Sequence, residues 1–151
     1  MDDCIFCAIV SGDASASIVY ADDVAVAFLD ISPVNAGHLL VVPRGHVATL
    51  AGLDAETGAH LFIVATRMAQ AIRHSGVRCE GINLFLADGE AAFQEVFHVH
   101  LHVIPRFAGD AFRIVADWTA PPGREELDAV AAQIRDVDQL LHDAPRLDLS
   151  D

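Results

Sequence analysis

Short apolar runs, some of them alternating with polar residues, predict the strands of this chain. Residues 17–30 alternate loosely around Asp22-Asp23, which is typical of a β-hairpin. Residues 38–42 form an apolar run that ends at Pro43, and residues 81–87 form another. Residues 97–104 alternate strictly up to Pro105, which cannot donate a backbone hydrogen bond to a neighbouring strand. We expect each of these segments to be a strand or a hairpin.

Two longer segments repeat their apolar residues at helical spacing. The first, residues 54–75, begins at the favourable N-cap Asp54 and stops before Gly76, and the second covers about 124–142. Because helices and strands do not alternate regularly, the pattern favours an α+β fold with an antiparallel sheet and two main helices. The apolar faces consist of Leu61, Val64, Ala65, Met68 and Ile72 in the first helix, and of Leu127, Val130, Ile134, Val137 and Leu141 in the second.

Composition indicates one globular domain and argues against nucleic-acid polymers as its partners. The 151 residues are 53% hydrophobic, enough for a core, and we expect a single domain over residues 1–151. The formal charge of −13 repels nucleic-acid backbones, so we expect no nucleic-acid polymer as partner. A small phosphate ligand is compatible, because the eight histidines can supply local positive charge near neutral pH.

We expect no signal for export or for membrane insertion in this chain. It opens with Met1-Asp2-Asp3-Cys4, unlike a signal peptide, and no apolar run approaches the roughly 20 residues of a transmembrane helix. Three cysteines fit a reducing compartment better than a disulfide framework. We therefore expect a cytoplasmic protein with no membrane partner.

The segment His98-Val99-His100-Leu101-His102 carries the main chemical signal. Strand side chains alternate with a period of two, so we expect the three histidines on one face. One neutral imidazole on such a face can attack phosphorus while its neighbours donate hydrogen bonds to phosphate oxygens. Two alternatives compete: half-buried or surface histidines without chemistry, and a metal site built from the imidazoles.

A second candidate cluster begins at the N-terminus. Cys4 and Cys7 form a Cys-x-x-Cys pair, which alone is also compatible with two buried cysteines or a redox pair. A thioredoxin-type redox pair belongs in a βαβ unit, which residues 1–10 do not predict. A structural zinc needs four Cys or His ligands, and His46, after the strand that ends at Pro43, is the expected third.

Three blocks of sequence resemble the histidine triad (HIT) superfamily of nucleotide hydrolases and transferases. The resemblance covers residues 4–112, which we expect to form the core of a HIT-like fold, whereas the helix at about 124–142 is less diagnostic. The blocks are Phe28-Leu29-Asp30-Ile31-Ser32-Pro33 with Gly37-His38-Leu39-Leu40-Val41-Val42-Pro43, then Asp88-Gly89 with Gln94-Glu95-Val96-Phe97, and then His98-Val99-His100-Leu101-His102-Val103-Ile104 with Pro105-Arg106.

The resemblance implies cleavage of a nucleotide conjugate at the α-phosphate through a nucleotidyl-histidine intermediate. It implies His100 as the nucleophile, a homodimer, and a nucleotide as substrate, and we expect no organic cofactor. The implied helpers beside the phosphate are His98, His102 and His38. The implied substrate contacts are the acidic Asp30 with Ile31 beside it, for the ribose, and the backbone N–H groups of the loop Phe93, Gln94, Glu95 and Val96, for the phosphate.

Some HIT hydrolases that open with Cys-x-x-Cys close a zinc site with the first triad histidine. The resemblance therefore implies a structural zinc in this chain, of the kind found in bacterial-type members. Zinc would clip the N-terminus to the catalytic strand and keep the coordinating nitrogen of that histidine deprotonated. The implied ligands are Cys4, Cys7, His46 and His98.

Three positions near the triad depart from the pattern of the family. Ala87 replaces a common Asn or Gln, Phe93 replaces a common Gly, and Glu95 stands where some members have Ser or Thr. A carboxylate at Glu95 would repel a polyphosphate, or carry a proton if its pKa rose. Two alternatives stay open: a non-catalytic nucleotide-binding protein, and a metal-dependent enzyme with the triad as ligands. Nucleoside phosphoramidates and dinucleoside polyphosphates are the candidate substrates.

Overall fold

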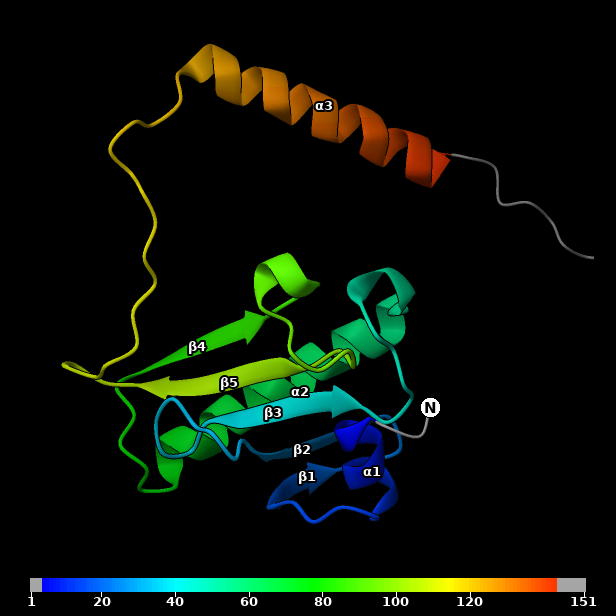
Figure 1. Ribbon diagram of the computed structural model, residues 1–151, viewed down its shortest axis with the longest axis vertical. Coiled ribbons are helices and arrows are strands. Elements are labelled where there is room, and N and C mark those ends of the chain that lie inside the picture. The colour runs from blue at the N-terminus through cyan, green and yellow to red at the C-terminus, as the bar shows by residue number, and fades with distance from the viewer. Residues whose placement is uncertain (1–3, 144–151) are drawn as a thin grey trace, which may run out of the picture. The chain divides into compact units, whose positions relative to one another are not determined.

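The structure, a computed structural model, describes residues 4–143 and is built on one antiparallel sheet (Figure 1). The five strands lie in the order β1-β2-β3-β5-β4. The described residues also form three α-helices, of which only α2 connects two strands, and this arrangement confirms the predicted α+β class. The strands are β1 (Ile18–Ala21), β2 (Ala25–Leu29), β3 (Leu39–Pro43), β4 (Gly81–Leu86) and β5 (Leu101–Arg106), and the helices are α1 (Ile5–Ser11), α2 (Ala55–His74) and α3 (Arg124–Asp143).

The chain divides into two units between Phe112 and Arg113. The first unit contains the sheet with α1 and α2, and the second contains α3. The expectation of a single domain over residues 1–151 stays a prediction, and residues 1–3 and 144–151 lie outside the described part. Within that part, no helix is long and apolar enough to cross a membrane.

The central strands are buried on both faces because their alternate residues meet different helices. One face of β2 and β3 packs on the apolar side of α2. The other face packs on Phe6 and Ile9 of α1. The first core layer includes Ala25, Ala27, Leu39 and Val41, and the second includes Val26, Phe28, Leu40 and Val42.

The triad segment differs from the predicted strand. The expected strand over residues 97–104 is β5, which begins only at Leu101 and continues through Pro105 to Arg106. The proline is tolerated because β3 pairs with β5 only as far as Val103, so Pro105 has a strand neighbour on one side. Before Leu101 the chain is irregular, and the Val99 amide donates to Val47 outside the sheet.

An ion pair between Arg106 and Asp110 lies at the C-terminal end of β5. Arg106 donates from Nε and from a terminal nitrogen to the two carboxylate oxygens of Asp110, at 2.6 and 2.7 Å. Asn35 donates to the same carboxylate and to the Pro105 carbonyl. The Arg106 guanidinium holds the pKa of the Asp110 carboxyl well below its usual range, and Asp110 is only 4% exposed.

We predict that Asp110→Asn lowers the free energy of unfolding by about 2 kcal/mol near pH 7, since it removes the charge that pairs with Arg106. A depressed carboxyl pKa stabilises the fold above the unfolded-state value of about 4, and this stability is lost as pH falls. The difference in the free energy of unfolding between the variant and the wild type, measured by urea titration, should therefore become smaller as the pH falls toward about 3. Exposed Asp23→Asn is the control, and a difference that does not change with pH would contradict the assignment.

Candidate functional site

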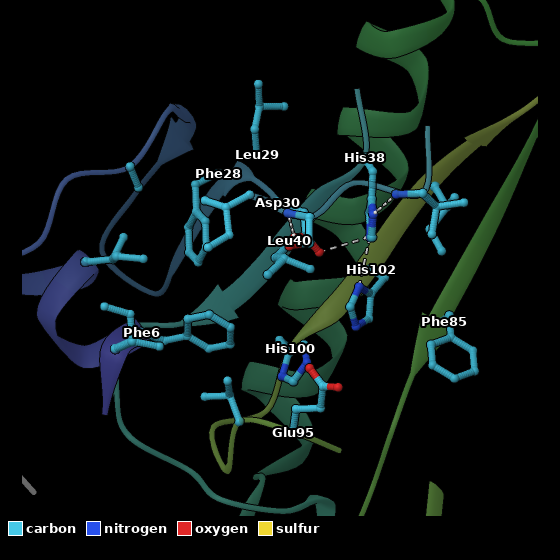
Figure 2. A pocket seen from close by; sticks show the side chains of 18 of the residues that line it. Phe6, Phe28, Leu29, Asp30, His38, Leu40, Phe85, Glu95, His100 and His102 are labelled. Atoms are coloured by element: carbon cyan, nitrogen blue, oxygen red, sulfur yellow. Dashed lines mark hydrogen bonds and ion pairs between the residues drawn. The ribbon is translucent and has the colours of Figure 1, made fainter. Parts of the chain in front are cut away.

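A pocket of about 530 Å³ lies on the face of the sheet that α1 partly covers (Figure 2). Strand pairing builds its floor: Phe28 lies opposite Leu40, Leu40 opposite His102, and His102 opposite Phe85. These side chains form one row across four strands, and all of them line the pocket. The volume falls in the range of small-molecule sites.

His100 faces this pocket with one defined nitrogen. Its Nδ1 lies 2.7 Å from the carbonyl oxygen of His98. A carbonyl oxygen only accepts hydrogen bonds, so Nδ1 carries the proton and Nε2 carries the lone pair. The residue is 6% exposed, lines the pocket, and has no partner for Nε2 among the residues that the structure describes.

A relay of hydrogen bonds fixes the protons of His38 and His102. The Val34 amide donates to His38 Nδ1 at 3.1 Å, so the proton of a neutral His38 is on Nε2. That Nε2 lies 2.9 Å from His102 Nδ1, to which it donates. The proton of His102 is consequently on its Nε2. Every bond in this relay is satisfied by neutral imidazoles.

Burial keeps both of these histidines neutral near pH 7. Burial first, and then the positive charge of His100 and His38 when protonated, lowers the pKa of His102 to about 4. Burial also lowers the pKa of His38, although the Asp30 carboxylate 3.6 Å away opposes this shift. The Val34 amide adds a geometric reason, since it faces the nitrogen that a second proton would occupy.

The same relay argues against a metal ion among Asp30, His38 and His102, whose ligand atoms lie within 4.8 Å of one another. A metal on His38 Nε2 would move the proton to Nδ1, where it would meet the Val34 N–H group. Asp30 has its own role in the loop, because its Oδ1 accepts the Ser32 amide at 2.8 Å. Asp30 and the 97% exposed Ile31 both line the pocket.

The loop at residues 93–96 reaches the pocket with fewer amides than predicted. Phe93 and Gln94 donate their backbone N–H groups within the turn, to Glu90 and Gly89. The Gln94 side chain is 4% exposed and bonds to backbone groups of the loop and to Ala48, so it supports the loop and does not line the pocket. The amides of Glu95 and Val96 have no partner within the described residues, and both residues line the pocket.

Phe93 occupies a backbone conformation that suits glycine. Its φ is +66°, a left-handed value, which gives a physical reason for the glycine common at this position in similar proteins. The ring is 85% exposed and lines the pocket. Ala87 is 3% exposed and lies outside the pocket lining.

A separate cluster brings together Cys4, Cys7, His46 and His98, whose ligand atoms lie within 4.8 Å of one another. Cys7 Sγ lies 3.3 Å from His46 Nδ1 and 3.6 Å from His98 Nδ1, and Cys4 Sγ lies 3.5 Å from His98 Nδ1. In a tetrahedral zinc site with Zn–S near 2.3 Å and Zn–N near 2.05 Å, sulfur and nitrogen are roughly 3.6 Å apart. The cluster therefore fits zinc.

His98 is prepared for a metal by its second nitrogen. Its Nε2 donates to the Pro43 carbonyl at 2.9 Å, which leaves the Nδ1 lone pair facing the two sulfur atoms. Burial, followed by the neighbouring Cys4, raises the pKa of the Cys7 thiol, so metal binding there displaces a proton.

The three triad histidines do not share one face. His98 is fully buried, does not line the pocket, and uses both ring nitrogens elsewhere, which differs from its expected place beside the phosphate. The reason is the irregular backbone before Leu101, which does not alternate as a strand does. His98 and His102 fall into different clusters of possible metal ligands, and His100 falls into neither among the described residues. A single metal site built from the triad is therefore incompatible with this geometry.

Sequence reasoning missed the contribution of α1. Its residues Ile5, Phe6 and Ile9 line the pocket. The signal was available: an apolar run with i, i+3 spacing stops at Gly12, whose φ of +89° ends the helix. A seven-residue segment is too short for periodicity alone to identify it.

Comparison with known proteins identifies the family of this chain. The model of the HIT domain family matches residues 11–109. The chain belongs to the HIT family. It is 42% identical over 113 residues to an uncharacterized HIT-like protein of Borreliella burgdorferi, a match that covers 74% of this chain and 81% of that protein.

The chain is also similar to a zinc-bound protein and to an enzyme. A Zn-bound histidine triad family protein from Mycobacterium smegmatis has 44% identity and a TM-score of 0.70, over 89% of this chain and 97% of its own. Adenosine 5'-monophosphoramidase hnt1 of Schizosaccharomyces pombe is 33% identical over 132 residues, 87% of this chain and 95% of its own.

The cysteine cluster predicts one zinc ion per chain. We expect Cys7→Ser to reduce bound zinc severalfold, because it removes one of four ligands, whereas Cys79→Ser outside the cluster keeps it. Elemental analysis of the purified variants measures this directly. Zinc that persists in Cys7→Ser but disappears in His102→Ala would place the metal in the pocket instead.

Proposed function

We propose that this HIT protein hydrolyses a nucleotide conjugate at its α-phosphate, with His100 as the nucleophile. One observation carries the proposal: His100 Nδ1 lies 2.7 Å from the carbonyl oxygen of His98, to which it donates its proton, so the Nε2 lone pair of His100 faces the pocket. Neutral imidazole is nucleophilic at pH 7. Attack by Nε2 forms a nitrogen–phosphorus bond and leaves positive charge on the ring, which the hydrogen bond from Nδ1 to the carbonyl stabilises.

In the proposed reaction the bond between phosphorus and the leaving group then breaks, and the leaving group takes a proton from solvent. Water next attacks the phosphorus and gives a proton back to solvent, and the nitrogen–phosphorus bond breaks with its electron pair returning to Nε2, which releases the nucleoside monophosphate and restores neutral His100. Negative charge on the phosphate oxygens would be stabilised by the His102 Nε2 proton, which points away from His38, and by the amides of Glu95 and Val96. The apolar end of the pocket, near Phe28 and Leu40, suits the base.

Among the candidate substrates, we propose a nucleoside phosphoramidate. Figure 2 shows the Glu95 carboxylate beside His100, and both residues line the pocket. A negative side chain there, on a chain of net charge −13, disfavours a polyphosphate leaving group and favours an amine. The relation to the adenosine 5'-monophosphoramidase of Schizosaccharomyces pombe supports the same choice.

We also propose that Cys4, Cys7, His46 and His98 hold a structural zinc ion. Zinc would cross-link the N-terminus to the segment before β5 and supply no group to the reaction. The donor distances near those of a tetrahedral site and the Zn-bound relative from Mycobacterium smegmatis support this assignment.

We further propose that the protein is a homodimer. Phe62 and Ile63 on α2 are 56% and 61% exposed. Apolar residues on α3 also recur at spacings of three and four, the pattern of a helix that packs against a partner. These side chains are Leu127, Val130, Ile134, Val137 and Leu141.

We predict that His100→Ala lowers the turnover of adenosine 5'-phosphoramidate at least about 10³-fold while the far-UV circular dichroism stays unchanged, because no other group replaces the nucleophile. Exposed His74→Ala, on α2, is the control and should keep full activity. Mass spectrometry of the rapidly quenched wild type should find added AMP on His100. Tight AMP binding with no turnover of phosphoramidate or diadenosine polyphosphate by the wild type would instead indicate a non-catalytic binding protein.

A further inference from the structure

Helix α1 touches both the cysteine cluster and the nucleotide pocket. Cys4 and Cys7 are three residues apart, so they lie on one side of the helix, which meets His46 and His98. Phe6 and Ile9 share another side, which lines the pocket. One short helix therefore forms a wall of each site.

The position of α1 depends on few interactions. The helix has seven residues, no side-chain hydrogen bond at its N-cap and no acidic residue in its first turn. Isolated helices of this length are unstable in water, so tertiary contacts must hold it. In the described structure these contacts are the apolar packing of Phe6 and Ile9 against β2 and β3, and the approach of the two cysteines to the histidines.

Phe6 stands between the two cysteines and reaches the nucleophile. Its ring centroid lies 5.2 Å from that of His100, with an angle of 75° between the planes. It makes similar edge-on contacts with Phe28 at 5.5 Å and with His98 at 5.9 Å, and it is 7% exposed. Figure 2 shows the ring of Phe6 directed into the pocket toward His100. A shift of α1 would move this ring away from both His100 and the apolar end of the pocket.

We propose that zinc binding and nucleotide binding are coupled through α1, and that Phe6 is the positioning residue that transmits the coupling. Ligation of Cys4 and Cys7 fixes α1, which holds Phe6 against His100 and completes the apolar wall of the pocket. The inference rests on the proposed nucleotide site and zinc site. Coupling is reciprocal, so bound nucleotide must strengthen zinc binding by the factor by which zinc strengthens nucleotide binding.

The test measures AMP affinity by calorimetry on zinc-loaded and zinc-depleted protein, together with zinc affinity by chelator competition with and without AMP. We expect zinc removal to weaken AMP binding at least about fivefold, and AMP to strengthen zinc binding by the same factor. Amide hydrogen exchange should accelerate over residues 5–11 on zinc removal, while β2 and β3 stay protected.

Phe6→Leu removes the ring but keeps an apolar side chain, so the domain should fold and hold one zinc ion. We expect the two affinities to become nearly independent in this variant. Val10→Ala, on the same helix but outside the pocket lining, should keep the coupling.

Several results would overturn the inference. Equal AMP affinity with and without zinc, in a protein that binds AMP, would overturn the coupling and leave the proposed function standing. Coupling of unchanged size in Phe6→Leu would contradict the role of Phe6 as the residue that transmits it. Loss of the whole far-UV signal on zinc removal would contradict a coupling confined to α1, and absence of AMP binding to the loaded protein would overturn the proposed function as well.

Discussion

A single hydrogen bond, from His100 Nδ1 to the carbonyl oxygen of His98, determines which nitrogen of the candidate nucleophile faces the pocket. A backbone group likewise determines which ring nitrogen carries the proton in two further histidines. Pro43 accepts from His98, and Val34 donates to His38. Backbone groups do not titrate near neutral pH, where histidines do, so these bonds fix the tautomers before any ligand binds. The pocket is therefore preorganised for attack by one nitrogen of His100.

His98 connects the two halves of the site through different atoms. Its carbonyl holds the proton of His100, while its ring completes the group of cysteines and histidines that fits zinc. A zinc ion there would thus anchor the backbone to which the nucleophile is tied. The three histidines of the triad consequently lie in three different environments. His98 is in the buried cluster with the cysteines, His100 faces the pocket, and His102 bonds to His38.

The regular elements followed from periodicity, whereas the irregular ones did not. Helix α2 and the hairpin of β1 and β2 lie where their apolar spacing predicts, since each buries one clear face. Strand β5 begins later than alternation predicts, because the His98 amide donates to the Val96 carbonyl and the Val99 amide donates to the Val47 carbonyl, outside the ladder of the sheet. Spacing alone does not predict the hydrogen bond between His38 and His102, because the two residues are distant in sequence. It also does not predict that the Phe93 and Gln94 amides donate within a turn, because this depends on the geometry of the turn. The Cys-x-x-Cys pair alone is ambiguous, so residue reasoning only added His46 as a third candidate zinc ligand, and resemblance to the family supplied His98 as the fourth.

The tautomers of the four histidines give the most direct test of this account, and ¹⁵N NMR of protein labelled in its histidine rings reads them. With zinc bound and near neutral pH, the account predicts a proton on Nδ1 of His100 and on Nε2 of His38, His98 and His102. Assignment by single His→Gln variants separates the signals. A His100 ring protonated on Nε2, with a bare Nδ1, would contradict the account, because the lone pair would then face the backbone and not the pocket.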